Sequence, residues 1–215
     1  MASLKEWATT RKARGLVAQL PSPDPQVCNA AVSRLAAMGN SVLPCLLDAL
    51  KSPDRRVRAS VAYVFCKTRP PAALEPLADR LSDPDDDVRV AVCRALKELG
   101  ERAVPVLLRC LEGPRPDVRR SAALILGEIG DHRATPQLVA CLNDDDDVNV
   151  RQAAAEAIGA IGDPRAVPPL VSLLHGDCRS GSHRALTALT RIGTPAALTA
   201  LKEWRERDYV PGHAS

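Results

Sequence analysis

The segment DDDVRVAVCRALKELG at residues 85–100 decides the fold, and DVNVRQAAAEAIGAIG at residues 147–162 repeats its pattern. Counted from the arginine of each Val-Arg pair, the third, sixth, seventh and tenth following positions are apolar, a spacing that places them on one face of a helix. The aspartate at the start suits a helix N-cap, and the final glycine suits a left-handed C-cap. Each segment therefore predicts an amphipathic helix of about three turns. The apolar positions are Val92, Ala95, Leu96 and Leu99, and Ala154, Ala157, Ile158 and Ile161.

The same pattern recurs through the chain with a nearly constant period. The arginines of four Val-Arg pairs follow one another at 31, 30 and 32 residues; they are Arg58, Arg89, Arg119 and Arg151. Glycine stands eleven residues after the last three of them, at Gly100, Gly130 and Gly162. The first arginine leads instead to Arg69 and Pro70, and we expect the proline to stop that helix. The expected N-caps are Asp24, Asp54, Asp85 and Asp147.

A second series of residues predicts another helix ahead of each of these. Its leucines recur at 31, 30, 31, 32 and 31 residues; they are Leu46, Leu77, Leu107, Leu138, Leu170 and Leu201. A proline stands two residues before four of them, and proline fits the first turn of a helix. These prolines are Pro44, Pro105, Pro136 and Pro168, with Pro76 displaced by one position.

The two series predict an all-α chain in which about six helical hairpins are stacked, a form of α-solenoid. We expect one domain over residues 1–215, with hairpins at about 1–40, 41–70, 71–100, 101–131, 132–162 and 163–193, and a final capping helix at 194–208. The end copies are degenerate, because Cys28 and Ser182 replace the arginine. Trp7 and Trp204 lie on the first and last helices, where we expect large side chains to close the ends of the core.

Composition limits the functions that the chain can have. Apolar residues make up 46% and aromatic residues 2%, so the core consists mainly of small and aliphatic side chains. A net charge of +3, from 29 basic and 26 acidic residues, lacks the concentrated positive field of non-specific nucleic-acid binding. The 7 cysteines include no Cys-x-x-Cys pair, and we interpret them as reduced, packed thiols in the cytoplasm. The N-terminus lacks the pattern of a signal peptide, and no apolar run is long enough to span a membrane.

The Asp-x-x-Val-Arg starts, the Leu/Ile-Gly ends and the segment DPRAVPPL at 163–170 resemble the HEAT-like repeats first associated with phycobilisome bilin lyases. The resemblance covers nearly the whole chain and implies HEAT-type hairpins. It also implies that Arg58, Arg89, Arg119 and Arg151 form a structural ladder, each pairing with an aspartate or a carbonyl of the adjacent repeat. Asp54, Asp85 and Asp147 lie one turn before their own arginines, which suits such a ladder. The fourth copy has Arg115 at this position, so Asp117 is the expected substitute there.

No residue set predicts catalysis, a cofactor or a metal site. The clusters at 83–87 and 144–147 lack the spacing of a calcium loop, and we interpret their aspartates as helix caps. No His-Glu dipeptide occurs, so the chain departs from the HEAT-like di-iron hydroxylases at the residues that would bind metal. We also find no phosphate loop and no nucleophile elbow.

Function is expected on the exposed positions of the second helices, which usually line the concave face of a solenoid. Tyr63, Arg94, Lys97 and Arg120 form a mildly basic, partly aromatic set typical of protein interfaces. The leading hypothesis is therefore a non-catalytic cytoplasmic scaffold that binds another protein through these residues. The alternatives are a bilin lyase or chromophore-handling subunit, and, less favoured, a nucleic-acid binder. A further alternative is that these residues form an ordinary solvated helix face without a binding role.

Overall fold

The structure is a computed structural model that describes residues 4–175 and 179–208. Helices make up most of these residues and no strand occurs among them, so the prediction of an all-α repeat solenoid is confirmed. The chain divides into two compact units, Met1–Val106 and Leu107–Ser215. The expectation of a single domain over the whole chain stays a prediction.

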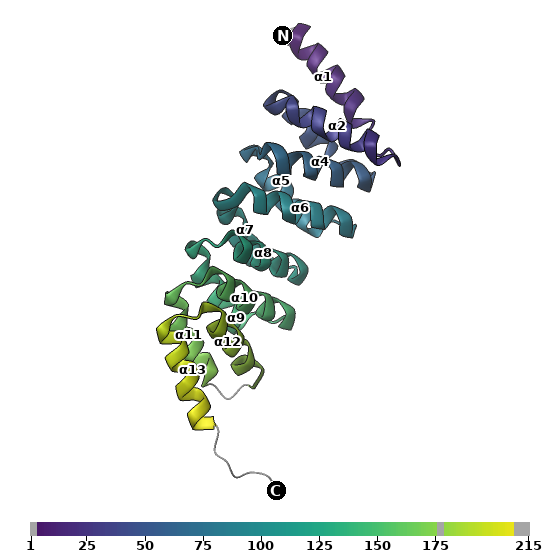
Figure 1. Cartoon of the computed structure of the whole chain (residues 1–215). Coiled ribbons are helices and arrows are strands. Elements are labelled where there is room, and N and C mark those ends of the chain that lie inside the picture. The colour runs from purple at the N-terminus through teal and green to yellow at the C-terminus, as the bar shows by residue number, and fades with distance from the viewer. Residues whose placement is uncertain (1–3, 176–178, 209–215) are drawn as a thin grey trace. The chain divides into compact units, whose positions relative to one another are not determined.

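In the first unit, each second helix packs against its neighbours, so that α4 contacts both α2 and α6 (Figure 1). The first helices lie behind them, and most begin with a short 3-10 turn. The elements are α1 (Leu4–Val17), α2 (Pro25–Ala37), η1 (Gly39–Val42), α3 (Leu43–Ala49), α4 (Arg55–Thr68), η2 (Pro71–Ala73), α5 (Leu74–Asp79), η3 (Arg80–Ser82), α6 (Asp86–Leu99) and η4 (Gly100–Ala103).

Helix α7 (Val104–Leu111) starts at the end of the first unit and continues into the second. In the second unit α10 contacts α8, α9 and α12. The remaining elements are α8 (Pro116–Ile129), η5 (His132–Ala134), α9 (Thr135–Asp144), α10 (Val148–Ile161), η6 (Pro164–Ala166), α11 (Val167–Leu174), α12 (Arg179–Ile192) and α13 (Pro195–Asp208). The order of elements agrees with the predicted hairpins and the final helix.

The core is the one that the leucine series predicts. All six leucines are buried, with at most 5% of the residue exposed, and the apolar positions quoted for α6 and α10 are buried with at most 9% exposed. Pro44, Pro136 and Pro168 stand in the first turn of α3, α9 and α11, where no intrahelical partner is lost. Burial of these leucines against the second helices stabilises each hairpin.

The predicted N-caps are confirmed at four helices. The carboxylates of Asp24 and Asp54 accept hydrogen bonds from the second backbone amide of α2 and α4, each at 2.8 Å. Asp85 accepts from the amide of Val88, and Asp147 from the amides of Asn149 and Val150. Each cap supplies an acceptor for an amide that the helix leaves without a partner.

The end of α4 differs in mechanism from the prediction. The expectation was that Pro70 would stop this helix, whereas Arg69 itself adopts the left-handed conformation, with φ 48°. Its amide donates to the carbonyl of Phe65 at 2.8 Å, as the amide of Gly130 does to Leu126 at the end of α8. Arginine therefore occupies a backbone position that favours glycine.

The role expected for Trp7 is wrong. This side chain is 60% exposed, because Ala13 and Leu16 form the buried side of α1. The Arg11 guanidinium lies 5.5 Å from the centroid of the Trp7 ring, a cation–π contact at the surface. Trp204 on α13 is half-buried.

The described cysteines are free thiols, and each is half-buried rather than fully enclosed. Burial raises the pKa of the Cys66 thiol to about 11 and also raises that of Cys141. Cys178 lies outside the described residues.

Helices α8 and α10 approach each other closely at Gly127. A β-carbon added there would lie 2.7 Å from the α-carbon of Ala157 and 2.9 Å from its β-carbon. Glycine at this position therefore permits a backbone approach that no larger residue allows without displacement.

Within the described ranges, no single helix is both long and apolar enough to cross a membrane. The segments Pro25–Ala37 and Gly39–Ala49 would meet the criterion of length and composition only as a pair bent by 113°.

Candidate interaction surface

The four column arginines share one local contact. In every copy the Nη1 atom donates to the carbonyl six residues earlier, in the connection between the two helices of the same hairpin. The acceptors are Ser52 for Arg58 (2.9 Å), Asp83 for Arg89 (2.7 Å), Gly113 for Arg119 (3.0 Å) and Asp145 for Arg151 (2.5 Å). Each arginine thus satisfies a carbonyl that the connection would otherwise leave without a partner.

Two of these arginines also reach the next hairpin. Arg58 donates from Nε and Nη2 to the two oxygens of Asp83, each at 2.8 Å. Arg119 binds Asp145 in the same manner, at 2.7 and 2.8 Å, and additionally Asp146 at 2.6 Å. Planar guanidinium and carboxylate groups match in this arrangement, which makes it one of the stronger polar contacts. The arginine column therefore has its side chains engaged within the fold.

The carboxylates in these pairs differ from those considered in the sequence. Asp54 and Asp147 cap helices, and Asp85 caps α6 while also accepting from Arg55 at 2.8 Å. The partners of Arg58 and Arg119 instead lie 25 and 26 residues further along, just before the second helix of the following hairpin. A one-turn offset on the same helix is therefore the wrong relation, because the arginine points towards the neighbouring connection.

The substitute expected in the fourth copy is also wrong. Asp117 pairs with Arg115, whose Nη2 lies 2.8 Å from its carboxylate, whereas Arg119 pairs with Asp145. The local pair forms because Arg115 is the N-cap residue of α8 and Asp117 lies in the first turn of the same helix.

Both pairing aspartates are held as carboxylates. Burial by itself would raise the pKa of Asp83, but the hydrogen bonds from Arg58 and from the amide of Asp85 lower it below the ordinary value. For Asp145, burial likewise acts to raise the pKa, while the bonds from Arg119 and from the amide of Asp147 lower it. The aspartates are thus charged, paired and largely withdrawn from solvent.

The exposed face of α4 and α6 carries three of the four predicted binding residues. Tyr63 on α4 is 39% exposed, and Arg94 and Lys97 on α6 are exposed one turn apart. Arg94 lowers the pKa of the Cys66 thiol of α4 against the dominant effect of burial, so its charge lies close to the neighbouring helix. The structure therefore brings these residues onto one face of a packed helix pair.

The fourth predicted residue, Arg120, is exposed on α8 and belongs to the second unit. Its spatial relation to the other three stays a prediction. Sequence reasoning missed Val90, which is 64% exposed on α6 one turn before Arg94. The position after the column arginine holds Ala59, Arg120 and Gln152 in other copies. An exposed β-branched residue at that variable position was the available signal.

The α4/α6 face, as we use the term below, consists of Tyr63, Val90, Arg94 and Lys97. Lys67 is also exposed on α4, one turn after Tyr63. Glu98, an acidic residue near the end of α6, forms an ion pair with Arg69 across the helix pair. The face thus combines two exposed apolar side chains with basic ones.

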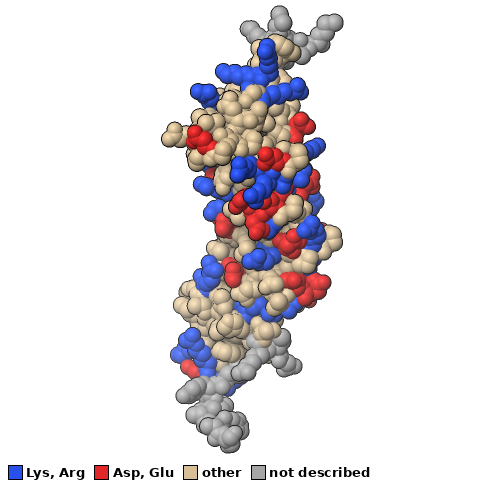
Figure 2. Space-filling view, turned by 90° about the vertical axis from the view of Figure 1, so that its right-hand side faces the viewer, with Lys and Arg blue, Asp and Glu red and all other residues tan. Residues whose placement is uncertain are grey.

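Other charged groups are distributed without one prevailing sign. Figure 2 shows basic and acidic side chains intermixed over the side of the chain that it displays. Within the clusters at 83–87 and 144–147, Asp85 and Asp147 cap helices, and Asp83, Asp145 and Asp146 pair with arginines. No group of three potential metal ligands occurs in the parts of the chain that the structure describes.

Comparison with known protein families identifies the family to which this chain belongs. The model for HEAT repeats matches residues 13–89, 74–159 and 144–212, which together span most of the sequence. The chain belongs to the HEAT-repeat family. No curated protein is similar enough to this HEAT-repeat chain to count as a match.

Several solved structures are similar to this HEAT-repeat protein at low sequence identity. An engineered protein is 22% identical, with a TM-score of 0.47, over 84% of this chain and 98% of its own. Human deoxyhypusine hydroxylase in complex with glycerol is 19% identical, with a TM-score of 0.43, over 88% and 98%. The complex of CpcE and CpcF of phycocyanin lyase from a Nostoc species is 20% identical, with a TM-score of 0.41, over 96% and 90%.

Proposed function

We propose that this HEAT-repeat protein is a non-catalytic scaffold that binds another protein through its α4/α6 face. Repeat solenoids bury their cores between neighbouring repeats and leave the outward positions of the second helices free of packing. Such folds are commonly used for protein binding rather than for catalysis. A cytoplasmic location and a contact from Arg120 of the second unit are parts of the same proposal.

The composition of the α4/α6 face carries this proposal. Tyr63 and Val90 expose apolar surface at the positions where a solvated helix would ordinarily carry polar groups. Tyrosine and arginine are enriched among the residues that contribute most to protein interfaces. Arg94 and Lys97 add positive charge, while the nearby carboxylate of Glu98 is engaged by Arg69. These features suit an acidic or mixed-charge partner surface.

Capture of partners from a lysate of the source organism tests the proposal. The bait is the intact chain, run beside the charge-reversed variant Arg94→Glu/Arg120→Glu and analysed by mass spectrometry. A matched control, Arg102→Glu/Arg205→Glu, changes the net charge equally at exposed positions outside the α4/α6 face. The proposal expects one protein that the intact chain and the control retain and the first variant loses.

Equal retention by all three baits would contradict the proposed face. Thermal unfolding of each bait is measured in parallel, because exposed substitutions of this kind are expected to change stability by less than about 0.5 kcal/mol. A bait that returns coloured would instead favour the handling of a chromophore.

A further inference from the structure

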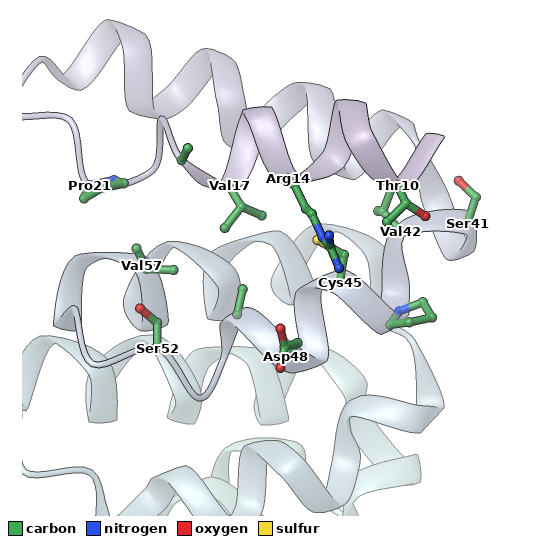
Figure 3. A pocket seen from close by; sticks show the side chains of 13 residues that line it. Thr10, Arg14, Val17, Pro21, Ser41, Val42, Cys45, Asp48, Ser52 and Val57 are labelled. Atoms are coloured by element: carbon green, nitrogen blue, oxygen red, sulfur yellow. The ribbon is translucent and has the colours of Figure 1, made fainter. Parts of the chain in front are cut away.

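The first unit contains a second surface of interest, a groove between α1 and α3. Its volume is about 650 Å³, within the range of roughly 300 to 1,000 Å³ that is usual for ligand sites. Val42, Ala49 and Val57 contribute side chains that are at most 9% exposed, so they form an apolar floor. Figure 3 shows α1 along one side and α3 along the other. The groove lies apart from the α4/α6 face.

Two opposite charges flank the middle of this groove. Arg14 extends from α1 towards Cys45 on α3, and Asp48 lies further along α3 (Figure 3). Both are exposed, and no hydrogen bond or ion pair engages either side chain among the described residues. Their charges are therefore available to a ligand, unlike those of Arg58 and Asp83.

The thiol between these charges behaves as a neutral group. Burial raises the pKa of Cys45; the nearby Arg14 acts to lower it, and Asp48 acts to raise it. The middle of the groove thus presents a guanidinium donor, a carboxylate acceptor and a weakly polar thiol. A ligand that fits must offer an acceptor or anion to the first and a donor or cation to the second.

The dimensions suit an extended chain. Thr10 and Val17 both line the groove, and seven residues of helix span about 10 Å. An extended peptide rises about 3.3 Å per residue, so about three residues fit along this stretch. Thr10 and Ser41 are exposed at one end, while Val17, Pro21 and Val57 lie towards the other (Figure 3). The exposed end at Thr10 and Ser41 therefore leaves room for a chain to continue.

We propose that this groove binds an extended peptide segment of a partner protein, with its polar groups between Arg14 and Asp48. The peptide offers a carbonyl or carboxylate to Arg14 and an amide or basic side chain to Asp48. An apolar side chain packs against Val17 and Val57. Hydrogen bonds to charged groups are strong enough for the loss of either residue to weaken binding about tenfold.

Selection of peptides tests this site. A library of random heptapeptides displayed on phage is selected against the intact chain and counter-selected against Arg14→Glu. Enriched peptides are labelled with a fluorophore, and their dissociation constants are measured by anisotropy. We expect Arg14→Glu and Asp48→Lys each to weaken binding about tenfold or more. The variant Arg102→Glu/Arg205→Glu, at exposed positions outside both surfaces, serves as the matched control and should bind as the intact chain does.

Two further measurements make the assignment specific. Bound peptide should slow the alkylation of Cys45 by N-ethylmaleimide, followed by mass spectrometry, and leave that of Cys28 unchanged. The double variant Arg14→Glu/Asp48→Lys should prefer peptides in which the acidic and basic residues are exchanged.

Three results would overturn the proposal. They are the absence of any enriched peptide, equal affinity for the intact chain and the groove variants, and displacement of the peptide by an equal concentration of a free amino acid. The last result would assign the groove to a small zwitterion. The groove variants and the α4/α6 variants change separate surfaces, so failure here leaves the test of the α4/α6 face unaffected.

Discussion

Asp83 receives two parallel hydrogen bonds from Arg58 of the preceding hairpin, each 2.8 Å long. The arginine side chain is 9% exposed and the aspartate side chain is fully withdrawn from solvent. A carboxylate in such a place depends on its partner, because an unpaired buried charge is costly. This pair is therefore a point at which stability can be tested with few substitutions.

Replacement Asp83→Ala should lower the free energy of unfolding by about 3 kcal/mol, since it leaves Arg58 buried without its carboxylate. The apolar double variant Arg58→Met/Asp83→Leu should lose less, because it removes both charges. Urea denaturation measures both. The control Arg55→Ala breaks an exposed pair with Asp85 and should change the midpoint least. A loss in Asp83→Ala no larger than in this control would refute a buried, interdependent pair.

Acid should unfold the chain through the same carboxylates. The pKa of Asp83 and that of Asp145 are lowered in the folded state, so the folded state binds fewer protons than the unfolded state. Their stabilisation is complete above the unfolded pKa of about 3.9 and disappears as pH falls through the lower folded values. Urea midpoints should stay level from pH 7 to about pH 5 and fall steeply below about pH 4. Asp83→Asn should show a smaller decrease across that interval.

Close packing of α8 and α10 predicts opposite effects for two glycine substitutions. Gly127→Ala should lower the free energy of unfolding by about 1 to 3 kcal/mol, because its β-carbon would collide with the backbone of Ala157. Gly15→Ala places a β-carbon in open space within α1 and should stabilise by up to about 1 kcal/mol. Equal effects in chemical denaturation would show that the backbone approach is unimportant.

The Cys66 thiol should react slowly with iodoacetamide. Its pKa of about 11, raised by burial, lies two units above the ordinary value of 9.0, so the thiolate fraction at pH 8 is about 100-fold lower. Site-resolved mass spectrometry should find alkylation at least about tenfold slower than in the urea-unfolded chain. Because folding favours the neutral thiol, this contribution to stability holds below pH 9 and is lost as pH rises towards 11. Reaction at the unfolded rate would contradict this environment.

The sequence predicts the periodic features of the fold and not the pairs between repeats. Caps such as Asp147 and leucines such as Leu138 follow from local spacing, because a helix repeats its geometry every few residues. The pairing of Arg119 with Asp145 depends on how one hairpin lies against the next, which periodicity does not specify. The left-handed backbone conformation of Arg69 could not be predicted either, because an arginine in the sequence does not indicate that conformation.

The two candidate surfaces could be predicted from the sequence to different degrees. The exposed positions of Tyr63 and Arg94 follow from helical spacing once the buried positions are known. The exposure of Val90 was missed because an apolar side chain suggests burial, although Arg120 and Gln152 at the same position of other copies mark that position as variable. The groove beside Arg14 could not be predicted from the sequence, because it depends on how α1 packs against α3.

The arginine contacts also bear on how the chain folds. Each Nη1 bond closes a loop of six residues, and the pairs of Arg58 and Arg119 close loops of 25 and 26 residues. Short loops lose little entropy on closure, and chains dominated by short sequence separations reach their native state quickly. A hairpin can therefore acquire most of its polar contacts as soon as its immediate neighbour is present, so that ordering can begin at several places along the chain and spread by addition of adjacent repeats.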